Sequence, residues 1–339
     1  AVFAVLAAFL AASAVSAGSS LTEEQYQFLF TKWVQQHNKS YENTNSLFSK
    51  YSTFKANVDL IIAHNSKDES FKMAINQFAD MTNAEFVEAM GLKKNEAKFA
   101  TVKKTTNSTK KTKTAPCPAM KKDTNIDWVE KGAMPKVRDQ AQCGSCWAFS
   151  TSGAVEGAYG AKTGKPAPII SEQQMVDCVN SSFDPSFISE GCDGGLMSEG
   201  MQYGAVNGFC ADEDYPYTAR DGTCKKNCKV VLKLAGFEEV HGDDEFVETI
   251  YESPIAVGIA ASSSAFQFYS SGVVDRCTDK SLNHGVVLVG YYPEEQKPYY
   301  YIRNSWGSSW GDKGHIRLTT KPGGNCGLAT SPWDVVAKL

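Results

Sequence analysis

Cys146 stands where a thiol can become a nucleophile. It follows the Gly144-Ser145 turn and opens a run with helical apolar spacing, which predicts a helix from Cys146 with Gly160 and Gly164 as stop signals. A helix N-terminus is the positive end of the helix dipole, and such surroundings lower a thiol pKa from about 8.5 to roughly 3.5–7.5. The sequence therefore predicts a reactive thiolate here.

Two other interpretations of these cysteines remain open at this point. The pair Cys143-x-x-Cys146 has the spacing of a redox disulfide or of half a zinc site, and most cysteines in secreted proteins are structural. A redox pair needs a thioredoxin-like βαβ pattern, and a zinc site needs a second close pair of Cys or His. Neither pattern is clear in this chain, so nucleophilic chemistry is favoured.

A thiolate nucleophile needs an imidazole partner that later protonates the leaving amine. Among the 5 histidines, His284 opens the apolar, strand-like run Val286–Val289, so we expect it to be the general acid and base. We expect solvated or packing roles for the other four, which are His37, His64, His241 and His315.

Asn304 is the candidate group that orients this imidazole. It follows the aromatic strand Tyr299–Arg303 and precedes Ser-Trp-Gly. Its amide oxygen can accept the imidazole N–H and fix the tautomer without adding a charge that titrates. A lone Asn at a strand end is otherwise a turn former, and the tryptophans that follow favour the orienting role.

The stretch Gln140–Ser150 resembles the active-site motif of papain-like, cathepsin L-type cysteine proteases. His284 lies 138 residues after Cys146, inside the family spacing of about 130–150 residues. The resemblance implies a nucleophile at Cys146, an acid and base at His284 and an orienting amide at Asn304. It also implies that Gln140 holds the oxyanion together with the backbone N–H of Cys146.

Three further positions bear on this site. Ala141 stands where relatives usually have Gly, which predicts strain in the turn beside the oxyanion site. The resemblance also implies that Trp306 and Trp310 shield the His-Asn pair and line the leaving-group side of the cleft.

The resemblance also implies where substrate binds. Gly194 and Gly195 are expected to let a peptide backbone approach and pair with the main chain, although adjacent glycines equally suit a plain turn. The pocket for the second residue before the scissile bond is expected to be apolar and roomy, without an acid at its base, and to favour Leu, Phe or Val over Arg. Its lining residues would be Leu196, Met197, Gly258, Leu282, Gly285 and Ser331.

Residues 1–17 carry no charge and are typical of a secretory signal peptide with a small-residue cleavage site. We expect this signal to begin before residue 1. No other run approaches the roughly 18 apolar residues of a membrane span. The expected route is secretory, and the destination is a lysosome-like vacuole or the extracellular space.

Residues 18–92 are expected to form a helical, inhibitory prodomain that lays an extended segment through the cleft. Phe54–Asn65 and Asn76–Asp80 resemble two propeptide motifs of cathepsin L-type zymogens. The usual Glu, Arg and Gly of these motifs are replaced by Ser46, Lys50 and Ala74. One apolar stripe at helical spacing is formed by Leu47, Tyr51, Phe54, Val58 and Ile61.

Residues 93–121, rich in Lys, Thr, Ser and Asn, are expected to be a flexible linker, and their Lys run suits a solvated tether better than a nucleic-acid site. The mature domain is expected at 122–339, after a cut near Met120–Asp123. Residues 18–121 carry 15 Lys and Arg against 10 Asp and Glu, whereas 122–339 carry 19 against 28. We hypothesise that this charge contrast helps to hold the prodomain until carboxylates protonate.

The 10 cysteines fit an oxidising compartment, and their connectivity cannot be deduced from sequence alone. The resemblance implies the pairs Cys143–Cys192, Cys178–Cys224 and Cys277–Cys326. Cys210 and Cys228 are then a candidate fourth bridge, and Cys117 remains alone near the cut. The sequons that a glycosylating host would modify contain Asn38, Asn107 and Asn180.

We therefore expect an α+β protein with a papain-like two-lobe fold, in which a helical lobe carries Cys146 and a β-barrel-like lobe carries His284 and Asn304. The favoured function is a monomeric endopeptidase zymogen that acts on proteins and peptides, needs no metal or cofactor and binds no nucleic acid. A catalytically silent or propeptide-locked binding protein is the alternative, and thiol labelling of Cys146 separates the two. A pure exopeptidase is disfavoured, because no insertion near Cys192 or before His284 is obviously able to block one end of the cleft.

Overall fold

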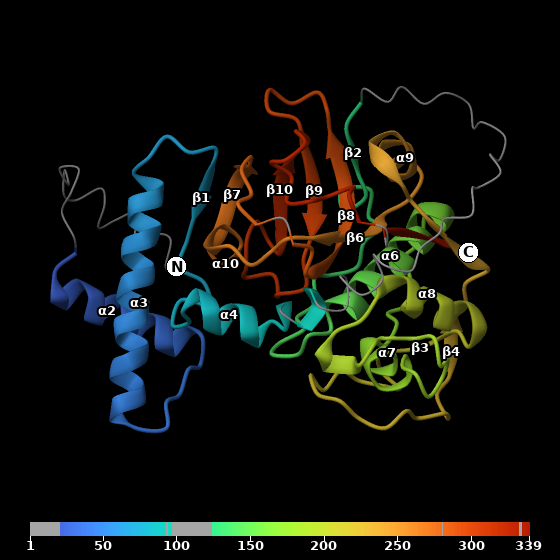
Figure 1. The fold of residues 1–339 in the computed structure, drawn as a ribbon, viewed down its shortest axis with the longest axis horizontal. Coiled ribbons are helices and arrows are strands. Elements are labelled where there is room, and N and C mark those ends of the chain that lie inside the picture. Colours follow the sequence, from blue (N-terminus) through green and yellow to red (C-terminus); the bar gives the residue numbers. More distant parts are fainter. Residues whose placement is uncertain (1–20, 93, 97–123, 280, 332–333) are drawn as a thin grey trace.

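The computed structural model describes residues 21–92, 94–96, 124–279, 281–331 and 334–339. Figure 1 shows the N-terminal helices, in blue, beside a large sheet, in orange and red, and a second group of helices, in green and yellow, below it. Over these described residues, no helix is both long enough and apolar enough to cross a membrane.

The N-terminal part contains the helices α2 (Glu23–Gln36), α3 (Thr44–Asn65) and α4 (Asn83–Ala89) and the strand β1 (Phe71–Met73). Each helix begins at a side-chain cap, because Thr22, Asn43 and Thr82 accept a backbone N–H from the first turn. The core of this part is formed by Tyr26, Leu29, Phe30, Trp33, Phe54 and Val58.

Two expectations for this part are corrected. The region is not helical throughout, since β1 separates α3 from α4. Leu47 does not share the buried stripe, because its side chain is 37% exposed whereas Phe54 is fully buried. The aromatic contacts of α3 with α2 involve Tyr51 and Phe54, which lie one and two turns further along the helix and pack on Phe30.

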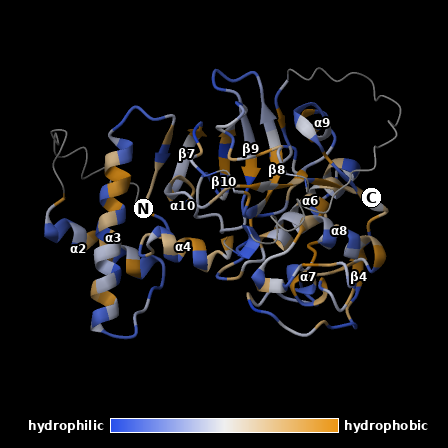
Figure 2. Cartoon of the chain, viewed as in Figure 1, coloured by the Kyte–Doolittle hydropathy of each residue, from blue (hydrophilic) through white to orange (hydrophobic). Residues whose placement is uncertain are grey.

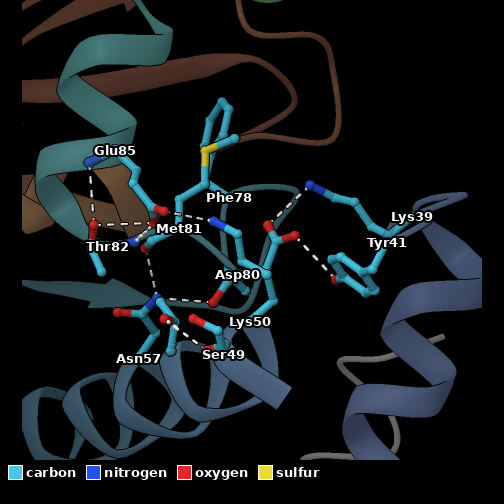
Figure 3. Close-up of polar contacts among 12 residues, drawn as sticks. Lys39, Tyr41, Ser49, Lys50, Asn57, Phe78, Asp80, Met81, Thr82 and Glu85 are labelled. Atoms are coloured by element: carbon cyan, nitrogen blue, oxygen red, sulfur yellow. Dashed lines mark hydrogen bonds and ion pairs between the residues drawn. The ribbon is translucent and has the colours of Figure 1, made fainter. Parts of the chain in front are cut away.

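Polar side chains fasten the segment after β1 to α3 and to the connection between α2 and α3 (Figure 3). Asn57, buried in α3, donates from Nδ2 to two main-chain oxygens of the segment Ala79–Met81, at 2.8 and 2.9 Å. Asp80 accepts from Lys39 Nζ at 3.0 Å and from Tyr41 OH at 3.1 Å. The motif residues therefore connect the helices to the chain that reaches the sheet.

The helical lobe contains α6 (Cys146–Thr163), α7 (Glu172–Cys178), η1 (Gly191–Asp193), α8 (Met197–Val206) and the paired strands β3 (Phe209–Cys210) and β4 (Val230–Leu232). α6 is buried along most of its length, and it ends at Gly164, whose φ of 64° is left-handed. Gly160 is not a stop as predicted. It lies inside α6, where a Cβ would clash with the backbone of Ala133, so this glycine permits close packing.

The large sheet contains β1, β2 (Ile126–Asp127), β5 (Gly236–Glu239), β6 (Ile255–Ile259), β7 (Tyr269–Val274), β8 (His284–Tyr292), β9 (Tyr299–Arg303), β10 (His315–Thr319) and β11 (Val335–Lys338). Its order is β1-β7-β10-β9-β8-β6-β11-β5, with β2 paired to β8 off this path. The helices α9 (Gly242–Ile250) and α10 (Ser264–Phe268) connect its strands along the chain. The apolar colours of the central strands in Figure 2 agree with their burial. The expected α+β class is confirmed.

The N-terminal part supplies the edge strand of this sheet. β1 runs antiparallel to β7 with Phe71 opposite Gly272, and Ala74 N donates to Phe268 O at 2.8 Å. Gly272 has a φ of 84°, and a Cβ there would clash with the backbone of Ser70. Main-chain pairing of this kind adds affinity through the backbone, whichever side chains the strand carries.

We expect Asn57→Ala to lower the free energy of unfolding of the N-terminal part by roughly 1–3 kcal/mol, because two buried main-chain oxygens lose their donor. The measurement is urea unfolding of the full chain carrying Cys146→Ala. Ser52→Ala, on the exposed side of the same helix, is the control and should change stability by less than about 0.5 kcal/mol. Equal effects of the two substitutions would contradict the anchoring role of Asn57.

Candidate active site

Cys146 is the first residue of α6 and is fully buried. Its Sγ accepts a hydrogen bond from Gly285 N at 3.3 Å. Burial raises the pKa of the Cys146 thiol to about 12, and backbone N–H groups at the helix start and at Gly285 oppose that shift. The direction is opposite to the lowered pKa predicted from the helix dipole, because the thiol is fully buried.

His284 begins β8 and is also fully buried. Its Nε2 lies 2.8 Å from Asn304 Oδ1, which also accepts from Ser305 N at 2.8 Å. An oxygen that accepts both bonds requires His284 Nε2 to donate, so Nδ1 is the basic nitrogen of the ring. Burial lowers the pKa of His284 to about 4, whereas the bond to Asn304 raises it.

Trp306 packs on the imidazole of the His-Asn pair, and the shielding roles of Trp306 and Trp310 stay predictions. The Trp306 ring stacks on His284 with centroids 4.7 Å apart, and Trp310 meets Trp306 edge to face at 5.0 Å. From the N-terminal part, Phe78 and Phe86 meet Trp306 in edge-to-face contacts at 5.7 and 5.2 Å. Aromatic rings from both parts of the chain therefore pack together beside this pair.

Gln140 is fully buried, and its amide is held at both atoms. Oε1 accepts from Ser305 Oγ at 2.6 Å, and Nε2 donates to Cys143 O at 2.9 Å. The next residue, Ala141, has a φ of 51°. The alanine that replaces the usual glycine is therefore left-handed, a conformation that strains a residue with a side chain. Asp139 Oδ1 supports this turn by accepting a hydrogen bond from Ala141 N at 2.8 Å.

Asn95 lies against the two glycines predicted to bind a peptide backbone. Gly195 N donates to Asn95 Oδ1 at 3.4 Å, and a Cβ on Gly194 would lie 2.9 Å from the same oxygen. Gly91 packs on Gly144, two residues before Cys146. The chain is helical at 94–96, and the extended segment predicted for the cleft stays a prediction because residues 97–123 lie outside the described residues.

The predicted pocket residues come together in two groups. A Cβ on Gly258 would lie 3.2 Å from Ser331 Oγ and 3.9 Å from Leu282 Cδ1. A Cβ on Gly285 would lie 3.2 Å from Met197 Sδ, and Leu196 is buried immediately before that methionine. The second group borders Cys146, whose carbonyl oxygen lies 3.2 Å from the same Gly285 position.

Asp334 was missed by the sequence reasoning, which expected no acid at this pocket. Its carboxylate is fully buried and accepts from Gly258 N at 3.0 Å through Oδ1. It also bonds the side chain of Ser331, and burial raises the pKa of Asp334 well above its usual range. An acid just before the apolar run Val335–Ala337 was the signal in the sequence.

Comparison with protein-family models matches residues 122–336 to "Papain family cysteine protease" and residues 30–86 to "Cathepsin propeptide inhibitor domain (I29)". The chain belongs to the papain family of cysteine proteases. Its papain-like domain is therefore a hydrolase of the cysteine-peptidase type, and a propeptide inhibitor domain precedes that domain in the chain.

Similar proteins span both parts of the chain. It is 38% identical to "Probable cysteine protease RDL2" of Arabidopsis thaliana, over 91% of this chain and 85% of that protein. It is 38% identical to "Cathepsin L 1" of Paramecium tetraurelia, over 90% of each. The structure of digestive procathepsin L 3 from Tenebrio molitor larval midgut has a TM-score of 0.79 and 33% identity, and the match covers 93% of this chain and 99% of that chain.

The cysteines of this family member form four bridges in the part of the chain that is described, namely Cys143–Cys192, Cys178–Cys224, Cys210–Cys228 and Cys277–Cys326. Cys146 is free within the same residues. No cluster of three or more His, Cys, Asp or Glu suited to a metal ion occurs in the residues whose structure is described.

Asn38 is exposed, and Asn180 Nδ2 donates to Asp177 O at 3.2 Å. Glycosylation of both stays a prediction. Four predictions fall outside the described residues, namely the expected signal peptide at 1–17, the sequon at Asn107, the lone Cys117 and the expected cut near Met120–Asp123.

We expect Asp334→Asn to stabilise the protein more at neutral than at acid pH. The folded pKa of Asp334 is raised, so folding favours the protonated acid and wild-type stability falls as pH rises above the unfolded value of about 3.9. Asparagine keeps an oxygen for Gly258 N and removes this dependence. Urea unfolding of the Cys146→Ala background should give a difference near zero at pH 3.5 and a more stable Asp334→Asn variant at pH 7. The same difference at both pH values would contradict the prediction.

Proposed function

We propose that this chain is the zymogen of an endopeptidase whose catalytic residues are Cys146, His284 and Asn304. The observation that carries the proposal is the pair of bonds made by consecutive residues of β8. His284 bonds the amide of Asn304 at 2.8 Å, and Gly285 N bonds the thiol of Cys146 at 3.3 Å. Because His284 and Gly285 are adjacent on β8, the strand holds the imidazole and the thiol close to each other, which supports their joint role in catalysis.

In the proposed reaction, Nδ1 of His284 takes the thiol proton and Cys146 attacks the peptide carbonyl carbon. The oxyanion accepts from the backbone N–H of Cys146 and from Gln140 Nε2, which leaves Cys143 O to reach it. The imidazolium then protonates the leaving amine, and the carbon–nitrogen bond breaks. Water activated by His284 hydrolyses the thioester and restores the thiol.

Three contacts support inhibition of this site by the propeptide. β1 completes the sheet at β7, Phe78 and Phe86 cover Trp306, and Asn95 takes the main-chain donor of Gly195. While the cleft is covered, burial raises the thiol pKa and lowers the imidazole pKa, which keeps both groups neutral. Removal of the cover returns water to the cleft and lets the proton pass from thiol to imidazole.

We further propose an inhibitory prodomain at 18–92, a linker at 93–121 and a mature enzyme at 122–339, with the cut near Met120–Asp123. The family supports a secretory route to a lysosome-like vacuole or to the extracellular space.

We expect the purified proprotein, incubated at pH 4.5 with a mild thiol reductant, to shorten to a fragment that begins near Met120–Asp123 and to gain hydrolysis of a Phe-Arg fluorogenic peptide. An epoxide inhibitor that alkylates thiols should abolish this activity, and Cys146→Ala should never show it. Iodoacetamide should label Cys146 at least about a hundredfold faster in the processed enzyme than in the proprotein, because the thiolate forms only in the open cleft. A folded processed domain that neither hydrolyses peptide nor takes label would instead support the binding-protein alternative.

We also propose an apolar preference at the pocket formed by Leu196, Met197, Gly258, Leu282, Gly285 and Ser331. Burial raises the pKa of Asp334, which disfavours a charged carboxylate there, and its Oδ1 is already bonded by Gly258 N. Leu-Arg and Phe-Arg peptides should be cleaved with a kcat/KM at least about tenfold above that of Arg-Arg, since an unpaired buried cation costs more than an apolar side chain. Faster cleavage of Arg-Arg would refute this preference.

A further inference from the structure

Tyr217 contacts the loop that carries the proposed oxyanion donor, although no motif pointed to it. Its hydroxyl donates to Gln140 O at 2.8 Å and lies 2.6 Å from Ser145 Oγ. A phenol has a single proton, and Gln140 O can only accept, so Ser145 is the donor of the second bond. One hydroxyl therefore joins the two ends of the segment Gln140–Ser145.

Ser145 does not make the usual cap bond of a serine at a helix start. Ser145 is the N-cap of α6, where a serine ordinarily accepts a backbone N–H of the first turn, but its side chain makes no cap bond. Its hydroxyl instead donates a hydrogen bond to Tyr217 OH. The hydroxyl of Ser145 therefore ties the residue before the helix to Tyr217, and not to the backbone of the first turn.

The bond to Gln140 completes the support of that residue. Gln140 N donates to Ser305 O at 2.8 Å, and Ser305 Oγ donates to Gln140 Oε1 at 2.6 Å. Tyr217 holds the remaining main-chain oxygen. The left-handed Ala141 follows directly, so the carbonyl that Tyr217 fixes belongs to the strained peptide of the turn.

Tyr217 is itself held rigidly. Its ring meets Phe149 of α6 edge to face at 4.9 Å, and the next residue, Thr218, donates twice to Gln173 Oε1 on α7, at 2.8 and 3.0 Å. Burial raises the pKa of Tyr217, which keeps the hydroxyl a donor. The hydroxyl of Tyr215, two residues earlier, instead donates a hydrogen bond to Asp177 Oδ2 at 2.6 Å.

We propose that Tyr217 is a positioning residue for the oxyanion site, where its hydroxyl holds Gln140 and Ser145 so that Gln140 Nε2 and Cys146 N–H converge on one oxygen. The inference rests on the proposed function. Tyr217 touches neither the substrate carbonyl nor the sulfur, so it acts on the step that develops the oxyanion and leaves formation of the thiolate unchanged.

The test compares Tyr217→Phe with the matched control Tyr215→Phe, which removes a buried hydroxyl from the same segment. Both are activated from the full chain and assayed with a Phe-Arg peptide. For Tyr217→Phe we expect kcat to fall about tenfold, less than the hundredfold or more for loss of a donor, with KM unchanged within twofold. Affinity for a peptide aldehyde, whose adduct carries the oxyanion, should fall by the same factor. The rate of Cys146 alkylation by iodoacetamide and its pH profile should stay the same.

An unchanged kcat would overturn the proposal, and so would a fall in alkylation rate that parallels kcat or an equal loss in Tyr215→Phe. If Tyr217→Phe does not fold, Ser145→Ala removes the other partner of the hydroxyl and should give the same separation of kcat from alkylation. A wild-type enzyme without activity would refute the proposed function, whereas an active wild type with an unaffected Tyr217→Phe refutes only this inference.

Discussion

The packing of α6 against β8 is the contact on which the candidate site depends. Ser150 Oγ donates to Val286 O at 2.6 Å, and a Cβ on Gly153 would lie 2.8 Å from Val287 Cγ2, so this glycine lets the strand approach the helix closely. The approach brings the start of the helix, at Cys146, to the start of the strand, at His284. Neither element forms the site alone, because the thiol and the imidazole come from different lobes.

Two arginines, the partly exposed Arg138 and the buried Arg303, fasten the two loops that complete this site. Arg138, two residues before Gln140, pairs with Glu156 at 2.6 Å and with Glu172 at 2.9 Å. Arg303, directly before Asn304, donates to the main-chain oxygens of Pro135 and Lys136 at 2.5 and 2.8 Å. A buried charge is costly without partners, so these arginines leave the adjoining backbone little freedom. Because Gln140 and Asn304 lie next to these arginines in the chain, their amides are held in place as well.

The N-terminal part uses three kinds of contact to cover the cleft: backbone pairing, aromatic packing and polar bonds from Asn95. Its ion pairs with the rest of the chain include Lys94 with Asp193 and Glu69 with Arg276, which have opposite polarity. The contrast in net charge between the two parts of the chain is therefore not repeated at each contact. The charge hypothesis stays a prediction, and the apolar contacts at Trp306 provide attraction that does not depend on pH.

Local chemistry let the sequence alone determine the helix at Cys146, whereas its resemblance to papain-like zymogens implied the α+β class and a chain divided into a propeptide-like part and a papain-like part. A helix start, an apolar strand and an Asn before Ser-Trp-Gly are each encoded by neighbouring residues. Tertiary structure decided the rest: the strand β1, the helical turn at Asn95, the role of Gly160 and the raised thiol pKa all follow from segments distant in the chain. Asp334 and Tyr217 were not predicted from the sequence for the same reason. The role of a buried carboxyl or of a phenol depends on the partners that folding places beside it.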